Sequence, residues 1–375
     1  MKEYKKDPSK FTGKPELPHY KKKGGVCSYA LTNEDCEIKT EDDGNGKPVY
    51  VVKFPLTKKR LTLGGSVPGR LIKIQVKPYH GIYNLCIVFD DGMEQPTLSE
   101  KPERICAIDF GVDNIAAMTN NIGLPNLLFK GGVFKSQNQW YNKQTARISS
   151  EQTKGTTDKF VPNEAYHKVC VKRENQFVDF SRKVAKQIID FCVKNKIDTL
   201  VLGRNKLWKK ESNIGKQNNQ TFVQMPIYRL IQSITAKAAA NGIRIVEQEE
   251  SYTSRASYLD NDFIPVYGEE PENMSFSGKR RPHGERGLYR TADGTIVNSD
   301  INGSANIGRK AFPDLYTGKV QFDNTIVIKH PDYETRILNH AKQLEANKQK
   351  DGQKKISKSK ARRLEKKSLT RYRAS

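Results

Sequence analysis

The sequence predicts a mixed α/β domain preceded by a small β domain, and three observations support this fold class. Between residues 26 and 100, short stretches alternate apolar and polar residues between glycine-rich turns, which is typical of half-buried strands. From residue 104 onward, continuous apolar runs alternate with long helical patterns, which is typical of a sheet crossed by helices. With 36% hydrophobic residues among 375, the chain can also bury a core.

The first segment, residues 1–25, is rich in lysine and broken by prolines, so we expect an extended basic arm. Lys21, Lys22 and Lys23 follow Tyr20 directly and place positive charge beside an aromatic ring. The arm is therefore either a solvated terminus or a nucleic-acid contact.

Residues 26–103 are expected to form the β domain, a small β-barrel or sheet. Turn residues such as Asp90-Asp91-Gly92 separate its apolar stretches. We expect its clearest strands at Val49–Val52, Leu71–Val76 and Tyr83–Phe89.

Residues 104–315 are expected to form the α/β domain, with two helices that cross between strands. Within it, 262–298 is rich in Gly, Pro and Arg and is expected to be an irregular insertion. Lys279, Arg280 and Arg281 of this insertion are candidate nucleic-acid contacts. We expect strands at 105–108, 115–118, 198–203 and 243–246, and helices at 136–150, around Phe177–Phe191, at 226–241 and from near Asn302.

The C-terminal segment, residues 316–375, is expected to be a basic tail. From residue 341 onward it carries 13 Lys plus Arg against 3 acids, and its apolar residues are few and scattered. Such a segment is either a disordered solvated tail or an arm that binds nucleic acid, with Arg362 and Arg363 among its contacts.

The overall charge points to a polyanionic partner. A net charge of +23 favours nucleic acid or an anionic membrane surface. We expect no membrane span, signal peptide or zinc site, because long apolar runs and CxxC pairs are absent from the sequence. A cytoplasmic protein fits these observations best.

Three carboxylates are candidates for a metal site. Asp109 ends the apolar strand run at 105–108, and Glu250 closes the acidic stretch that follows the run at 243–246. Asp300 stands at the start of the last helix. Each has a simpler interpretation: Asp109 as a turn or cap residue, Glu250 as part of a solvated acidic loop, and Asp300 as a helix N-cap.

Taken together, the three acids predict phosphoryl transfer. Carboxylates at strand and helix ends can hold two Mg²⁺ ions, one to activate water and one to stabilise the leaving oxygen. A basic protein with such a trio would act on a phosphodiester. Asp109-Phe110-Gly111 does not indicate a kinase, since no glycine-rich loop, Val-Ala-Ile-Lys strand or His-Arg-Asp loop accompanies it.

The sequence resembles the OrfB/TnpB-type proteins of insertion sequences, which are relatives of type V CRISPR effectors. The matching segments occur in the family's order between about residues 4 and 315. They are Lys14–Lys21, Ile108–Gly111, Gln139–Lys143, Asn218–Val223, Tyr252–Ser254 and Asp300–Ile307.

The resemblance implies a RuvC nuclease domain of RNase H-like fold behind a wedge-type β-barrel. It implies an RNA-guided complex that cuts target DNA, with guide RNA and target DNA as partners and Mg²⁺ or Mn²⁺ as cofactor. By motif match, Asp109 would be the first RuvC aspartate and Asp300 the third acid.

The sequence departs from the family pattern at three places. The middle glutamate usually follows the strand at 199–202, where this chain has Gly203, so we expect Glu250 to supply it from the next strand. The cysteine pairs that often follow Thr-Ser are missing, so no zinc is expected. Only 108 residues precede Asp109, so we expect a shortened copy or a start at an internal Met.

The leading interpretation is an RNA-guided DNA endonuclease of a mobile element. The alternative is a truncated or cleavage-inactive protein that binds RNA or DNA, such as a remnant or a repressor-like derivative.

Overall fold

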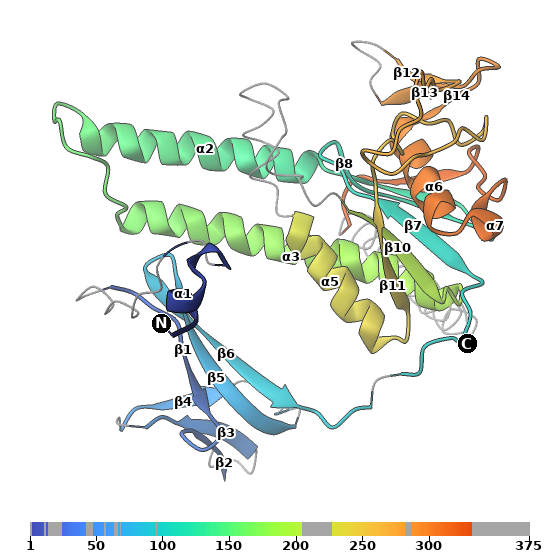
Figure 1. The fold of residues 1–375 in the computed structure, drawn as a ribbon. Coiled ribbons are helices and arrows are strands. Elements are labelled where there is room, and N and C mark those ends of the chain that lie inside the picture. Colours follow the sequence, from blue (N-terminus) through green and yellow to red (C-terminus); the bar gives the residue numbers. More distant parts are fainter. Residues whose placement is uncertain are drawn as a thin grey trace, which may run out of the picture. The chain divides into compact units, whose positions relative to one another are not determined.

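The computed structural model describes most of the chain, which divides into two compact units, residues 1–94 and 95–375 (Figure 1). The residues described are 2–10, 13, 25–42, 48–55, 58–63, 67, 69–94, 96–204, 227–281 and 287–331.

The N-terminal unit contains two three-stranded antiparallel sheets. A short helix and a 3-10 turn come first, at α1 (Lys2–Lys6) and η1 (Pro8–Lys10). The first sheet has the order β1-β5-β6 and the second β2-β3-β4. Their strands are β1 (Tyr29–Thr32), β2 (Glu37–Asp42), β3 (Pro48–Lys53), β4 (Arg60–Leu63), β5 (Arg70–Tyr79) and β6 (Ile82–Asp90).

The two sheets share one small apolar cluster. Cys36, Val52 and Ile74 are buried in it, and apolar residues from both sheets pack against them. His80 and Gly81 connect β5 to β6 with positive φ angles of 44° and 79°, which suits a tight hairpin turn. The predicted strands are therefore confirmed. The predicted barrel is not, since the described residues of this unit form two separate sheets.

The second unit is built on a six-stranded mixed sheet with the order β11-β10-β7-β8-β9-β15. The first three strands of this unit, β7, β8 and β9, are antiparallel neighbours. β10 then pairs parallel to β7, and β11 parallel to β10. The strands are β7 (Ile105–Asp109), β8 (Asn114–Asn120), β9 (Asn126–Lys130), β10 (Thr199–Arg204), β11 (Arg244–Glu249) and β15 (Thr325–Ile328).

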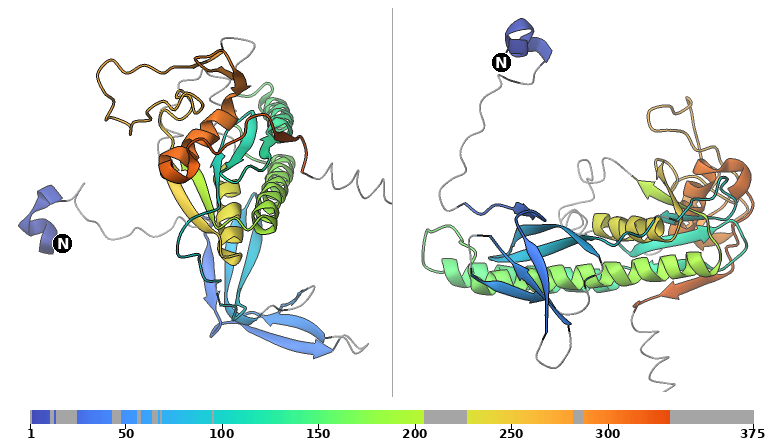
Figure 2. Two further views of the ribbon diagram at one scale, coloured as in Figure 1. Left: turned by 90° about the vertical axis from the view of Figure 1, so that its right-hand side faces the viewer. Right: turned by 90° about the horizontal axis from the view of Figure 1, so that it is seen from below.

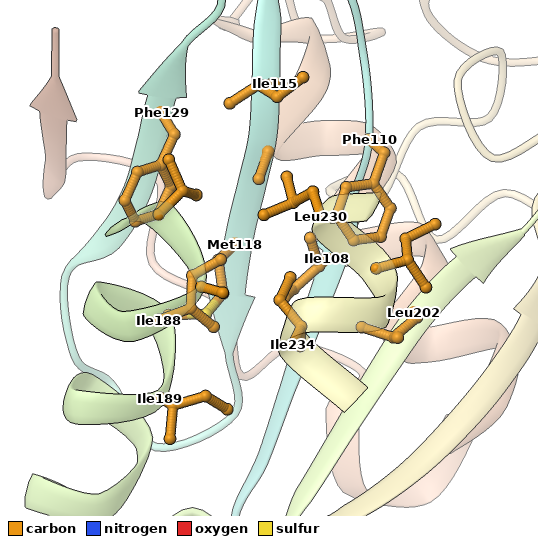
Figure 3. Close-up of a cluster of buried hydrophobic side chains, with 14 of the residues drawn as sticks. Ile108, Phe110, Ile115, Met118, Phe129, Ile188, Ile189, Leu202, Leu230 and Ile234 are labelled. Atoms are coloured by element: carbon orange, nitrogen blue, oxygen red, sulfur yellow. The ribbon is translucent and has the colours of Figure 1, made fainter. Parts of the chain in front are cut away.

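Helices cover both faces of this sheet, with α3 and α6 on opposite sides (Figure 2). On one face, α2, α3 and α5 pack in the main apolar core, part of which is drawn in Figure 3. On the other face, α6 and α7 form a second, smaller cluster with the sheet. The helices are α2 (Gly132–Thr153), α3 (Glu164–Lys194), α5 (Ile227–Ala240), α6 (Ser299–Ala311) and α7 (Pro313–Tyr316).

The alternation of side chains along β7 determines which face Asp109 occupies. Cys106 and Ile108 belong to the core under α3 and α5, where Figure 3 labels Ile108, whereas Ile105 and Ala107 pack on the α6 side. Because successive residues of a strand point to opposite faces, Asp109 at the strand end lies on the α6 side.

The structure extends the sequence-based prediction at several points. The helix predicted at 136–150 spans 132–153, and the last helix begins at Ser299 rather than near Asn302. The insertion carries a small sheet of β12 (Lys279–Arg280), β13 (Leu288–Arg290) and β14 (Ile296–Asn298). β9 and β15 were not predicted, and β15 carries the domain sheet beyond residue 315 into the range predicted as tail. Within the described residues, no helix combines the length and apolar character that a membrane crossing requires.

Candidate functional site

The three predicted acids line one cavity of about 440 Å³. Asp109 is the last residue of β7, Glu250 follows the last residue of β11, and Asp300 lies in the first turn of α6. Arg280 of β12 lines the same cavity. Glu250 lies 141 positions after Asp109 in the chain, and Asp300 lies 50 positions after Glu250. The ends of two strands and one helix thus bring the three acids together.

Asp109 is held in a tight position against α6. A Cβ atom on Gly303 would stand 2.6 Å from Asp109 Oδ2, so a larger residue at 303 would displace this carboxylate. Burial raises the pKa of Asp109 well above its usual range, and repulsion from Asp300 and Glu250 raises it further, while Arg280 acts in the opposite direction. This carboxyl therefore lies within electrostatic reach of both other acids.

Glu250 reaches the end of the neighbouring strand β10. A Cβ atom on Gly203 would stand 3.3 Å from Glu250 Oε2 and 2.6 Å from Ile307 Cδ1. The Glu250 carboxylate therefore lies beside the position where the family pattern usually has its middle acid. Burial, with a smaller contribution from Glu249, raises the pKa of Glu250 to about 7.

The neighbouring Glu249 has a different set of partners. Its Oε2 lies 2.6 Å from Lys310 Nζ, and its Oε1 accepts a hydrogen bond of 2.7 Å from the Ser251 backbone N–H. These bonds hold the pKa of Glu249 below its usual range against the opposing effect of burial. Of the two acids, only Glu250 lines the cavity with Asp109 and Asp300.

Asp300 is not the N-cap of its helix. The side chain of Asn298 caps α6 by accepting hydrogen bonds from the backbone N–H groups of Asp300 (3.0 Å) and Ile301 (3.1 Å). The Asp300 carboxylate instead accepts hydrogen bonds from Asn114 Nδ2 and from Arg280 Nη2, the latter at 3.3 Å. The capping interpretation of Asp300 is therefore wrong.

Buried polar residues of α6 fix the loop that follows Glu250, and their roles were not predicted. Asn302 accepts a hydrogen bond from Tyr258 N (3.0 Å) and donates one to Ala256 O (2.8 Å). Asn306 donates to Thr253 O (2.9 Å) and to Ala256 O (2.7 Å). The signal was present in the sequence, because two asparagines spaced by four lie on one helix face.

The predicted nucleic-acid contacts divide into two groups. Arg280 lines the cavity, and Lys279 beside it on β12 is exposed. Arg281 follows them and is half-buried. The remaining candidates, Lys21, Lys22, Lys23, Arg362 and Arg363, lie outside the described residues.

The donor set of the cavity fits a divalent cation such as Mg²⁺. No three Asp, Glu, His or Cys side chains in the described ranges are grouped closely enough to hold one ion directly. Mg²⁺, however, keeps several waters and uses only one or two carboxylates. The repulsion that Asp300 and Glu250 exert on Asp109 is what a bound cation would relieve.

Comparison with known proteins agrees with the resemblance found in the sequence. The model of the OrfB_IS605 family, described as a probable transposase, matches residues 89–209. This match confirms that the chain is similar to insertion-sequence proteins of the OrfB type. Among curated proteins, none matches the chain.

The chain is also similar to solved CRISPR effectors. A Cas12f1–sgRNA–target DNA complex is 17% identical at a TM-score of 0.41, with 76% of this chain and 67% of that chain covered. A CRISPR-Cas12f ternary complex is 18% identical at 0.37, with 67% and 46% covered. The mini-RNA-guided endonuclease Cas_phi3 is 11% identical at 0.37, with 64% and 51% covered. The chain thus spans between about half and two thirds of these proteins.

Proposed function

We propose that this protein is an RNA-guided DNA endonuclease of a mobile element, with a RuvC-type active site at Asp109, Glu250 and Asp300. One observation carries the proposal: the three carboxylates line one cavity at the ends of β7, β11 and α6. The mixed sheet with helices on both faces supports it as well, because it agrees with the α/β nuclease domain that the sequence resemblance implies.

In this proposal the acids of the cavity bind metal, and its arginine contacts the substrate. Asp109, Glu250 and Asp300 would hold Mg²⁺ or Mn²⁺, and no zinc is expected. When bound, such ions supply an activated water and stabilise the leaving oxygen of the phosphodiester. Arg280 places a positive charge beside Asp300, where it can contact a phosphate of the substrate.

We propose guide RNA and target DNA as the partners. The excess positive charge of +23 supports nucleic-acid binding, and similar proteins were solved with guide RNA and target DNA. In this proposal residues 1–25 are a basic arm, 26–103 a wedge-like domain, 104–315 the nuclease domain and 316–375 a basic tail, whose β15 joins the sheet of the nuclease domain.

The alternative function is nucleic-acid binding without cleavage. The hydrogen bonds that Asn114 and Arg280 donate to Asp300 favour it, because they occupy an acid that the metal site needs. Cleavage requires that these hydrogen bonds break when a divalent ion and nucleic acid enter the cavity. In the alternative function the bonds remain.

The deciding experiment measures cleavage and binding together. The full chain is expressed with the DNA that flanks its gene, and the RNA that copurifies is sequenced to identify the guide. We expect DNA complementary to this guide to be cut in Mg²⁺ and left intact in EDTA. Asp109→Asn should abolish cutting and retain binding. Tight binding by the parent without any cutting in Mg²⁺ or Mn²⁺ would instead establish the alternative function.

A further inference from the structure

One aromatic side chain that lines the cavity of the three acids packs with a second aromatic ring and an arginine, which do not line the cavity themselves. Tyr252 lines this cavity, and its ring stacks on Phe276 with 6.4 Å between centroids and 27° between planes. The guanidinium of Arg255 lies over both rings, 5.9 Å from the Tyr252 centroid and 5.3 Å from that of Phe276. We name these three side chains the Tyr252 cluster.

The Tyr252 cluster is not part of the apolar core. Tyr252 and Phe276 are half-buried, Arg255 is exposed, and none of the three joins the core clusters of the described residues. Over the described part of the chain, Arg255 forms no ion pair with a carboxylate. The cluster therefore keeps planar surface and an uncompensated positive charge available beside the cavity.

The backbone of Tyr252 is held in an unusual conformation. Its φ of +65° lies in the left-handed region, which is uncommon for a residue other than glycine and costs conformational energy. The turn is fixed because Tyr252 O accepts hydrogen bonds of 2.9 Å from the backbone N–H groups of Arg255 and Ala256. The tyrosine hydroxyl is fixed as well, by a hydrogen bond to Glu270. Glycine adopts this backbone conformation more easily than tyrosine, so the presence of the aromatic ring indicates that the side chain has a role of its own.

We propose that the Tyr252 cluster stacks against an unpaired nucleobase next to the scissile phosphate, which makes Tyr252 a positioning residue for cleavage. Aromatic rings bind bases of any sequence through their faces, and a neighbouring arginine adds a cation–π contribution. A phosphodiester in the cavity would bring the adjoining base to Tyr252, which lies two residues after Glu250. This inference rests on the proposed nuclease function.

The first test reads stacking without cleavage. A single-stranded DNA oligonucleotide that carries 2-aminopurine is bound in Ca²⁺, and quenching of its fluorescence reports stacking. The parent and Tyr252→Phe, which keeps the ring, should quench the fluorescence. Tyr252→Gly removes the ring and suits the left-handed turn, so it should fold and fail to quench. Tyr228→Ala, which changes an exposed tyrosine on α5, is the matched control and should behave like the parent.

The second test uses substrates with one abasic nucleotide, moved along the strand around the mapped cut. For the parent, kcat/KM should fall on the order of 5- to 100-fold when the missing base is the one next to the cut, as expected for one base–aromatic stack. On intact DNA, kcat/KM of Tyr252→Gly should be lower than that of the parent by a similar factor. On the abasic substrate, kcat/KM of the variant and of the parent should be the same.

The outcomes separate this proposal from the proposed function. A parent that quenches 2-aminopurine and cuts no DNA keeps the stacking site and overturns the nuclease. A parent that cuts DNA and is insensitive to every abasic position overturns the stacking site alone. Two outcomes would assign the Tyr252 cluster a purely structural role. One is that the parent does not quench the fluorescence. The other is that Tyr252→Gly cuts more slowly than the parent by the same factor on intact and on abasic DNA.

Discussion

At the scale of single residues, the choice between Glu249 and Glu250 can be decided by charge removal. Glu250→Gln keeps the shape of the side chain and removes its charge, so the proposed cleavage should fall by at least about 100-fold while nucleic-acid binding stays near that of the parent. Glu249→Gln should change cleavage only slightly, because Glu249 pairs with Lys310 away from the cavity. Cleavage and filter binding of the RNA-loaded protein measure both quantities.

Opposite behaviour of the two variants would place Glu249 in the site. Normal cleavage by both would remove the middle acid from β11 altogether. The site would then have to be rebuilt around Asp109 and Asp300.

The raised pKa of Glu250 predicts a pH-dependent stability in the absence of divalent ions. The folded state holds the pKa near 7 against an ordinary value of 4.5, so it binds more protons than the unfolded state between these limits. Stability that Glu250 contributes at low pH is therefore lost as pH rises from about 4.5 through about 7.

Glu250→Gln has no such charge to bury. In EDTA it should be more stable than the parent by about 1–3 kcal/mol at pH 8 and similar to it at pH 4.5. Urea unfolding at the two pH values measures this difference. An advantage of the variant that is the same at both pH values would show that the carboxylate does not titrate as inferred.

At the scale of elements, α6 supports the site through a residue with no side chain. Gly303→Ala should improve helix propensity by about 0.5–1 kcal/mol, yet its Cβ would stand 2.6 Å from Asp109 Oδ2. We expect the clash to dominate, with a net loss of about 1–3 kcal/mol in stability and loss of cleavage through displacement of Asp109. Gly132→Ala in α2 is the matched control, because a Cβ there meets no atom within 4 Å. It should leave cleavage unchanged and should not lower the melting temperature.

The elements that carry strong local patterns were predictable from the sequence. β7 and β10 are buried apolar runs, β11 begins with a short apolar stretch, and α3 shows a clear helical period, so local patterns in the sequence indicate all four. β15 is four residues long and pairs with β9, almost 200 residues away in the chain. No pattern in the sequence near β15 specifies such a pairing. The basic residues that follow β15 instead favour a tail in this part of the chain.

In the candidate site, too, features with a local sequence pattern could be predicted and features that depend on tertiary packing could not. The three acids could be proposed because each stands at the end of a predicted element. Asn298 and Asp300 are both good N-cap residues, so the sequence could not decide which of them is left to face the cavity. The bonds of Asn302 and Asn306 to the loop after Glu250 depend on tertiary packing, which a pattern of helix propensity does not contain.

At the scale of the whole molecule, the charge distribution predicts how binding depends on salt. Residues 341–375 carry a net charge of +10 out of +23 for the chain. Each phosphate that a basic residue neutralises releases bound counterions, so log affinity falls linearly with log salt, by about 0.7 per contact for single strands. RNA affinity should therefore fall steeply between about 50 and 300 mM salt.

Removing the tail tests where these contacts are made. If several of its 13 basic residues contact RNA, deletion of 341–375 should flatten the salt slope by several units and weaken binding most at low salt. A second variant keeps the length of the tail and replaces those residues, Arg362 and Arg363 included, with Gln. It should match the deletion, because charge rather than length carries the effect. An unchanged slope in both variants would assign RNA binding to the rest of the chain, and a slope lost only on deletion would show that the tail contributes by something other than charge.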